Sequence, residues 1–382
     1  MNFADLTRLR PKASARLASR YNPRMRAILA AVAGGGLLAA SPGLAQISPP
    51  TVRAEFLRTI DRPRVPLAPS TPQISTVDGY TQELLSFASE PDERVPVLIL
   101  TKPAASARRA VLIALHGTNG RKESMRGLLE RYADEGFVAV AMDARHAGER
   151  ATPIPGLANP YQSAMLRAFR TGKGQPYLYD TVWDVMRLID YLSTRADVDP
   201  SRIGVVGNSK GGTEAYLAAA ADSRIAAVVP LIGVQSFGWS LTHAAAWEAR
   251  TWTFRAAVEA AAADGKQPVN AGFMKTFYDR ITPGLVDRFD GPAMLPLIAP
   301  RPLLVVNGDS DPRSALGGVR TAVAAAERAY AAAGAKEKFS FLLQVDTAHT
   351  VTPEAHDAVL QWFVRWLEPR ISSSAPRRAG RP

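Results

Sequence analysis

Residues 202–212 read RIGVVGNSKGG, and an alanine-rich run follows them as far as Ala221. The β-branched residues before Gly207 predict a buried strand, and the run after Gly211 favours a helix. A serine between these glycines predicts a sharp turn from strand to helix, because the strained backbone leaves little room for side chains beside it. Ser209 is therefore the candidate nucleophile, at the C-terminal end of a strand and near the N–H groups of a helix N-terminus.

The composition is that of an ordinary globular protein of one large or two smaller domains, with 382 residues, 47% of them hydrophobic and 21% charged. The formal net charge of +11 is concentrated at the ends. Residues 1–45 hold seven basic side chains against Asp5, and three arginines lie within 371–382. The remainder is close to neutral, so we expect no nucleic-acid partner. The absence of cysteine excludes disulfides, thiolate metal ligands and a cysteine nucleophile.

Residues 1–45 have the pattern of a signal peptide. Basic residues precede an apolar stretch at 27–40, and a small-x-small cleavage pattern ends at Ala45. The pattern predicts Sec-type export to the periplasm or the medium, with no stable membrane anchoring after cleavage. Met1 and Met25 are both possible translation starts, because Met25 would begin a more compact signal. An uncleaved anchor or a buried helix is the alternative, but the stretch is short and interrupted by glycine.

Residues 46–75 are predicted to be a proline-rich lead-in on the surface, because six prolines disfavour regular structure over most of it. A hairpin of strands at 81–89 and 95–100 is expected to follow. Strands and helices then alternate, as in a parallel sheet. The predicted core strands are 110–115, 137–142, 203–207, 225–232, 302–307 and 339–345. The predicted helices are 122–135, 179–194, 210–221, 314–333 and 353–367. Residues 151–178 are predicted to form a long surface loop.

Residues 234–298 interrupt this alternation and are far longer than an ordinary strand-to-helix loop. They follow the strand after the nucleophile helix, so they emerge at the carboxyl edge of the sheet, where ligands bind in open α/β folds. We expect a helical lid over Ser209. At least one of Trp239, Trp247 and Trp252 is expected to contact substrate. The alternative is that these aromatic residues only pack the insertion onto the body.

Four motifs together resemble the α/β-hydrolase superfamily, in its dienelactone-hydrolase, acetylxylan-esterase and prolyl-oligopeptidase-like branches. The motifs are VGNSKGG at 206–212, APRPLL at 299–304, GDSDP at 308–312 and HTVTPE at 349–354. The resemblance covers residues 78–368. It implies an α/β-hydrolase domain at 76–370, with a mostly parallel central sheet, helices on both faces and a helical lid insertion. The remaining residues, 371–382, are expected to be a disordered basic tail.

The order serine, acid, histidine after successive strands is that of an α/β-hydrolase triad. The resemblance implies that Asp311 is the acid, and Asp309, earlier in the same turn, is its rival. The acid would orient His349, whose Nε2 would take the proton of Ser209. Four further histidines compete with His349 and are assigned structural roles, His243 with the option of facing substrate. They are His116, which is expected to shape the oxyanion loop, His146, His243 and His356.

The oxyanion hole is expected to use the backbone N–H groups of Thr118 and Lys210. The side chain of Lys210 is expected to form an ion pair with Glu214, on the helix surface or half-buried. A second group of charged residues is expected to form a salt-bridged loop beside the active site and not a charged binding site. Its members are Asp143, Arg145, Glu149 and Arg150.

These observations predict an exported serine hydrolase that cleaves carboxylic esters through an acyl-enzyme, without cofactor or metal. Its substrate would be a small-molecule or polysaccharide-linked ester. A prolyl-oligopeptidase-like peptidase and a non-catalytic binding scaffold are the alternatives, and the sequence does not separate hydrolysis from acyl transfer. A serine nucleophile where dienelactone hydrolases have cysteine, and the lack of a propeller domain, favour the esterase.

Overall fold

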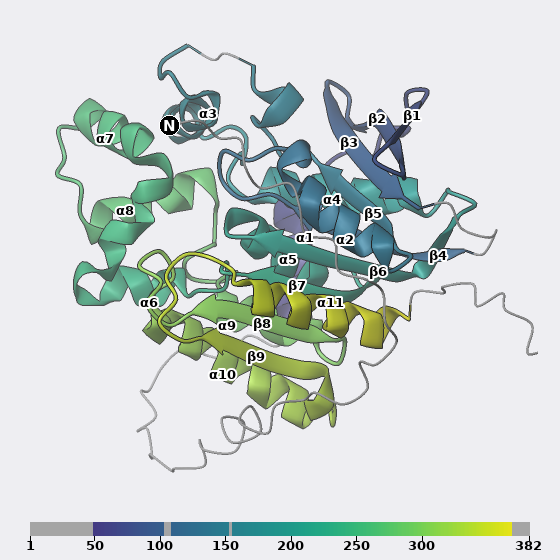
Figure 1. The fold of residues 1–382 in the computed structure, drawn as a ribbon. Helices are drawn as coiled ribbons and strands as arrows, with labels where there is room; N and C mark the ends of the chain where they lie inside the picture. The colour runs from purple at the N-terminus through teal and green to yellow at the C-terminus, as the bar shows by residue number, and fades with distance from the viewer. Residues whose placement is uncertain (1–48, 103–107, 153–154, 369–382) are drawn as a thin grey trace, which may run out of the picture. The chain divides into compact units, whose positions relative to one another are not determined.

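A nine-stranded sheet organises the part of the chain that this computed structural model describes, residues 49–102, 108–152 and 155–368 (Figure 1). The strand order is β1-β2-β3-β5-β4-β6-β7-β8-β9. The pairs β1-β2, β2-β3 and β3-β5 are antiparallel. All the other pairs of neighbouring strands are parallel. The strands are β1 Gln73–Val77, β2 Tyr80–Glu90, β3 Glu93–Thr101, β4 Arg109–Leu115, β5 Val138–Met142, β6 Val198–Asn208, β7 Ile225–Leu231, β8 Leu303–Gly308 and β9 Phe339–Gln344. The predicted mostly parallel sheet is confirmed, and β1 is an edge strand that the sequence analysis missed.

The helices alternate with the parallel strands. The α-helices are α1 Pro49–Ile60, α2 Arg126–Asp134, α3 Pro160–Thr171, α4 Tyr179–Leu192, α5 Lys210–Ala221, α6 Phe237–Thr242, α7 Arg255–Asp264, α8 Ala271–Ile281, α9 Gly291–Met294, α10 Leu316–Ala332 and α11 Pro353–Leu367. The short 3₁₀ helices are η2 Lys122–Met125, η3 Gly148–Arg150, η4 Ala244–Arg250, η5 Trp252–Phe254, η6 Leu295–Ile298 and η7 Lys336–Lys338. Every core helix predicted from sequence is present, with small differences in its ends.

Alternate residues of the central strands belong to two separate hydrophobic cores. In β4, Val111 and Ile113 pack with helices α1, α4, α5 and α10, while Leu112 and Ala114 pack with α2 and α11. All seven residues of β4 are buried. Side chains of a strand alternate between faces, so a continuous apolar run can be buried on both. The predicted helices on both faces of the sheet are therefore confirmed.

Helix α1 corrects the expectation of an irregular surface lead-in. Its two prolines lie in the first turn, where the backbone N–H groups have no partner inside the helix, so proline is tolerated there. Val52, Phe56 and Ile60 recur every four residues, which places them on one face, and they are 9%, 0% and 1% exposed. The Phe56 ring packs edge-on at 5.3 Å from that of Tyr179 on α4. The lead-in therefore contributes to the core.

Helix α3 corrects the expectation of a long loop at 151–178. The side chain of Asn159 caps its start by accepting a hydrogen bond from the N–H of Gln162 at 3.2 Å. Pro160 fits the first helical position, and Gly172 ends the helix with a φ of 67°. The turn-forming residues that suggested a loop therefore mark the two ends of a helix.

The insertion at 234–298 is helical, as predicted, and its helices α7 and α8 lie against α3 (Figure 1). Most of its aromatic side chains are buried together: the rings of Phe254 and Phe277 stack at 5.4 Å, and Phe237 and Tyr278 meet at 5.3 Å. These four residues therefore fit the alternative expectation, in which the aromatic side chains of the insertion serve packing. Whether the insertion acts as a lid remains a prediction.

The proposed signal peptide at 1–45 and the basic tail at 371–382 lie outside the described residues. No helix in the described ranges is long and apolar enough to cross a membrane.

Candidate active site

The turn between β6 and α5 holds Ser209 in an unusual backbone conformation, with φ of 56° and ψ of −113°. Such a conformation is strained for a residue with a side chain and persists only where the surroundings impose it. Gly207 and Gly211 make it possible, since a Cβ on Gly207 would lie 2.0 Å from the carbonyl oxygen of Gly211. Helix α5 begins at Lys210, so its N-terminus adjoins the serine. The predicted strand, sharp turn and helix are all present.

Ser209, His349 and Asp311 form one hydrogen-bonded row, although each comes from a different loop of the sheet edge. Ser209 Oγ lies 2.8 Å from His349 Nε2, and His349 Nδ1 lies 2.7 Å from Asp311 Oδ2. A carboxylate can only accept at this contact, so Nδ1 carries the proton and Nε2 is free to accept from the serine hydroxyl. The structure therefore brings together the three side chains that the sequence analysis selected.

Asp309 has a different set of contacts from Asp311. Its carboxylate accepts hydrogen bonds from the N–H groups of Asp346 at 3.1 Å and Thr347 at 3.2 Å, in the loop that leads to His349. These bonds and one from the Ser310 hydroxyl, the largest cause, hold the pKa of Asp309 below its ordinary value. Asp309 thus shapes the histidine loop, whereas Asp311 contacts the imidazole.

The loop after β4 approaches the nucleophile turn at Gly117. A Cβ there would lie 3.2 Å from the carbonyl oxygen of Asn208 and 3.6 Å from Ser209 Cβ, so a larger residue would crowd the turn. The Gly117 oxygen accepts from the N–H of Gly120 at 3.1 Å and lies 2.8 Å from His116 Nδ1. A trans peptide directs its C=O and N–H to opposite sides. The N–H of Thr118 in the same peptide unit is therefore turned away from His116.

His116 is held in one tautomer by two backbone groups. The N–H of Ala144 donates to its Nε2 at 3.1 Å, so the proton resides on Nδ1 and is donated to the Gly117 oxygen. Burial, and secondly the positive charge of Lys210, lower the pKa of His116 to about 4. The ring is therefore neutral at pH 7, and it fixes the orientation of the peptide that contains the Thr118 N–H.

The Lys210 side chain pairs with Glu214, as predicted, but the pair is buried rather than exposed or half-buried. The two side chains are 5% and 1% exposed. The packing of α3, the helix that sequence analysis missed, explains this burial: the Tyr161 ring centroid lies 5.8 Å from Lys210 Nζ. Burial raises the pKa of Glu214 above its ordinary value, although Lys210 acts in the opposite direction.

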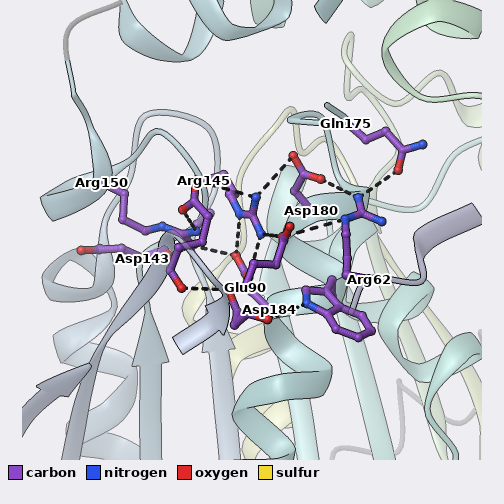
Figure 2. Close-up of polar contacts among 12 residues, drawn as sticks. Arg62, Glu90, Asp143, Arg145, Arg150, Gln175, Asp180 and Asp184 are labelled. Atoms are coloured by element: carbon purple, nitrogen blue, oxygen red, sulfur yellow. Dashed lines mark hydrogen bonds and ion pairs between the residues drawn. The ribbon is translucent and has the colours of Figure 1, made fainter. Parts of the chain in front are cut away.

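The predicted salt-bridged loop is present (Figure 2), but all of its charged side chains except that of Glu149 are buried. Asp184 on α4, 0% exposed, pairs with Arg145 at 3.2 Å and with Arg150 at 2.7 Å. Burial opposes its ionisation, but the two arginines prevail and lower the pKa of Asp184 to about 2. Asp143, also 0% exposed, pairs with Lys122 at 3.2 Å. Each buried charge thus meets an opposite charge, which fits a structural network.

Asp143 also anchors the segment that follows the Gly117 loop. Its carboxylate accepts from the N–H of Lys122 at 2.8 Å and from the N–H of Glu149 at 3.0 Å. Gly148, with a φ of 52°, makes room for it, since a Cβ there would lie 2.3 Å from the carboxylate. The network therefore connects the buried charges to the backbone next to the candidate oxyanion loop.

The other histidines occupy separate places. Burial lowers the pKa of His146 to about 4, and His356 lies on α11. His243 is exposed and stacks on Trp239 with ring centroids 4.0 Å apart. No cluster of three or more histidine, aspartate or glutamate side chains that could hold a metal ion occurs in the ranges that the structure describes.

The three tryptophans of the insertion differ in their surroundings. Trp239 packs on α10, where a Cβ on Gly317 would lie 2.2 Å from its ring. Trp247 is partly buried against the hydrophobic core, and Trp252 is 40% exposed. Trp239 contacts the helix that follows the Asp311 turn, so it has the strongest structural claim to the predicted role, which remains a prediction.

Comparisons with known proteins point to esterases. Residues 57–236 match the model of the acetyl xylan esterase family, and residues 167–334 match that of the fungal glucuronyl esterases. The uncharacterized protein YcjY of Escherichia coli is 33% identical over 118 residues, 31% of this chain and 33% of that protein. A Synechocystis protein provisionally named carboxymethylenebutenolidase is 30% identical over 122 residues, 31% of this chain and 47% of its own. The alignments thus span less than half of either relative.

Solved structures resemble this chain at low sequence identity. Methylesterase BT1017 has a TM-score of 0.60 at 20% identity, covering 84% of this chain and 64% of that chain. Acetyl xylan esterase 1 from Thermoanaerobacterium has a TM-score of 0.59 at 18% identity, and the match covers 82% of this chain and 93% of that chain. A glucuronoyl esterase from Solibacter usitatus has a TM-score of 0.54 at 16% identity, and the match covers 81% of this chain and 91% of that chain. At these identities the likeness establishes the fold.

The chain thus has the α/β-hydrolase fold, and each of the two esterase family models matches a part of it. Both matching family models describe carboxylic ester hydrolases, in agreement with the branch that the sequence motifs indicated.

Proposed function

We propose that this protein hydrolyses carboxylic esters with Ser209 as the nucleophile. The observation that carries the proposal is the row of hydrogen bonds from Ser209 Oγ through His349 to Asp311, at 2.8 and 2.7 Å. Such a row activates a hydroxyl group that is otherwise a weak nucleophile at pH 7. The matches to two esterase families support an ester as the substrate.

In the acylation step Ser209 Oγ attacks the ester carbonyl carbon, and His349 Nε2 takes the hydroxyl proton. Asp311 accepts the Nδ1 proton in a hydrogen bond and stabilises the imidazolium. The N–H groups of Thr118 and Lys210 hold the carbonyl oxygen as it becomes an oxyanion. The C–O bond to the alcohol then breaks, the alcohol leaves with the proton from His349, and an acyl-Ser209 ester remains.

In the deacylation step water replaces the alcohol. His349 accepts a proton from the attacking water, the same two N–H groups hold the oxyanion, and the bond to Ser209 Oγ breaks as the proton returns to the serine. The products are a carboxylic acid and the free enzyme. The chain's own side chains and backbone supply every group in this cycle, so no cofactor or metal takes part in it.

The substrate in this proposal is a small-molecule or polysaccharide-linked ester, in keeping with the acetyl xylan and glucuronyl esterase matches. The insertion at 234–298 would cover Ser209, with one or more of Trp239, Trp247 and Trp252 against the substrate. Export to the periplasm or the medium, directed by residues 1–45, would bring the enzyme to such substrates.

The test is an activity panel with purified protein and the Ser209→Ala variant. It comprises p-nitrophenyl esters of increasing acyl length, acetylated xylan, feruloyl esters and aminoacyl anilides. We expect ester hydrolysis by the parent and a fall in kcat on the order of 10⁶ in the variant, as in mutational series on such triads. Cleavage of the anilides alone would replace the esterase with a peptidase. A panel with no turnover at all would favour a binding scaffold.

A further inference from the structure

Arg250, the last residue of η4 in the insertion, is a buried cation without an anionic partner. The residue is only 6% exposed to solvent. One of its terminal nitrogens donates to the amide oxygen of Gln235, the guanidinium carbon lies 5.7 Å from the Phe237 ring centroid, and Nε is buried without a hydrogen-bond partner. Among the described residues no carboxylate lies within ion-pair distance of it. An unpaired buried charge is costly, so its retention calls for an explanation.

The other buried arginines make Arg250 an exception. Within the described ranges four arginines are buried, and three of them meet a carboxylate. Arg109 pairs with Asp197 at 3.4 Å, Arg145 with Asp184 at 3.2 Å and Arg187 with Asp190 at 2.5 Å. Among the described residues Arg301, which is partly buried, also lacks a carboxylate partner, but it donates to three backbone oxygens instead. Arg250 has an amide and an aromatic ring in their place.

Buried tyrosines lie both beside Arg250 and beside the helix that follows Ser209. The Tyr278 hydroxyl donates to the backbone oxygen of Arg250 at 3.1 Å, and its ring centroid lies 5.9 Å from that of Tyr177. The Tyr161 ring centroid lies 5.8 Å from Nζ of Lys210, the residue after Ser209. The Tyr161 hydroxyl is buried and has no hydrogen-bond partner. Tyr161 on α3 is thus a second buried donor without a partner, and it lies beside α5.

The backbone gives a second, shorter connection. Gly233 packs directly on the nucleophile turn, because a Cβ there would lie 2.4 Å from the carbonyl oxygen of Ser209. Gln235, the side chain that contacts Arg250, is two residues further along. Arg250 is therefore attached, through Gln235, to the segment that leaves the Ser209 turn.

We propose that Arg250 binds a carboxylate group of the substrate, with the Tyr161 hydroxyl as a further donor, so that the enzyme prefers esters carrying a second, free carboxylate. The inference rests on the esterase proposed above and assigns its substrate class. A planar guanidinium matches a carboxylate with two parallel hydrogen bonds, and these bonds are strong where water is excluded. A neutral ester leaves Arg250 unpaired, so an ester that carries a carboxylate should bind more tightly than a neutral ester of the same length.

The experiment compares two esters of equal chain length, mono-p-nitrophenyl glutarate and p-nitrophenyl pentanoate. The first replaces the terminal methyl group of the second with a carboxylate. We expect a higher kcat/KM for the glutarate ester in the parent protein. The ratio of the two kcat/KM values should fall about 10- to 100-fold in Arg250→Gln, less in Arg250→Lys, and several-fold in Tyr161→Phe. Arg255→Gln removes an exposed charge from the same insertion and should leave both values unchanged.

Calorimetric titration with glutarate dianion separates this inference from the esterase proposal, because it needs no turnover. We expect binding to the parent and to Arg255→Gln, and none to Arg250→Gln. Hydrolysis of neither ester together with Arg250-dependent glutarate binding would remove the esterase and retain the carboxylate site. An unchanged ratio in both Arg250→Gln and Tyr161→Phe, or glutarate binding that survives Arg250→Gln, would overturn the site. Should Arg250→Gln fail to fold, Tyr161→Phe decides the question, since it removes only one oxygen.

Discussion

The buried charges of the sheet edge and the buried Arg250 of the insertion differ in how they are matched. At the sheet edge, around β4, β5 and α4, buried charges are matched: Asp184 meets two arginines, and Asp143 meets a lysine and two backbone N–H groups. In the insertion, Arg250 meets only an amide and an aromatic ring. Matched charges fix a geometry, whereas an unmatched charge leaves interaction energy available for a ligand.

This difference assigns separate tasks to the two regions. Changes at the sheet edge should affect turnover of every substrate, because the candidate oxyanion loop lies there and the proposed reacting groups Ser209, Asp311 and His349 follow other strands of the same carboxyl edge. Changes in the insertion should redistribute activity among substrates.

The largest contrast is within one turn, between Asp311 and Asp309. Asp311→Asn should lower kcat on the order of 10⁴, because an amide at this contact favours the wrong imidazole tautomer. Asp309→Asn should cost far less, because Asp309 contacts the backbone of the histidine loop and not the ring. Steady-state kinetics on a neutral ester measures both variants. If Asp309→Asn proved the more damaging, the acid would be misassigned.

The second prediction concerns stability between pH 4 and 6.5. His116 in the folded protein has a pKa of about 4, against 6.5 for an ordinary histidine. In this window the unfolded chain binds a proton that the native state does not, so the free energy of unfolding falls as the pH drops from 6.5 to 4. Above pH 6.5 the contribution is constant. The loss due to His116 is about 3 kcal/mol at most.

Burial also lowers the pKa of His146 to about 4, so it titrates in the same window and serves as the matched control. Urea unfolding at several pH values should show a shallower pH dependence in both His116→Gln and His146→Gln. Only His116→Gln should also lower kcat, because only His116 holds the Gly117 peptide. Equal kcat values in the two variants would contradict the orienting role of His116.

The smallest effect is expected in the insertion. Trp239→Ala should change the preference between short and long or aromatic acyl groups by about 3- to 10-fold, with little change in melting temperature. Trp252→Ala should leave the profile unchanged, because Trp252 is the most exposed of the three tryptophans, at 40%. The measurement is kcat/KM across the p-nitrophenyl ester series. An unchanged profile in variants of Trp239, Trp247 and Trp252 alike would direct the search for specificity to residues 151–179.

The sequence analysis succeeded where chemistry depends on short local patterns. The Gly-x-Ser-x-Gly turn, the Asp311 turn and the His349 loop each follow a buried strand, and parallel strands bring such loops to one edge. Sequence patterns do not predict α1 and α3, because the proline and glycine residues that mark the ends of these helices also favour loops. A cap such as Asn159-Pro160 followed by Gly172 was the available signal.

The buried pairings were beyond local reasoning for a different reason. Asp184 reaches Arg145 and Arg150 across 39 and 34 residues of chain, and no spacing rule connects them. In the same way, the isolation of Arg250 is visible only once every neighbour is known. Sequence therefore predicted the three side chains that the structure brings together, while the matching of buried charges required the structure.

The most direct test of the central claim is the site of covalent labelling by a fluorophosphonate probe. The probe phosphonylates an activated serine, and peptide mass spectrometry then locates the adduct. The account predicts one stoichiometric adduct on Ser209, which is lost in Ser209→Ala and strongly slowed in Asp311→Asn but not in Asp309→Asn. An adduct on another residue, or a parent protein that hydrolyses esters yet resists the probe, would contradict the account.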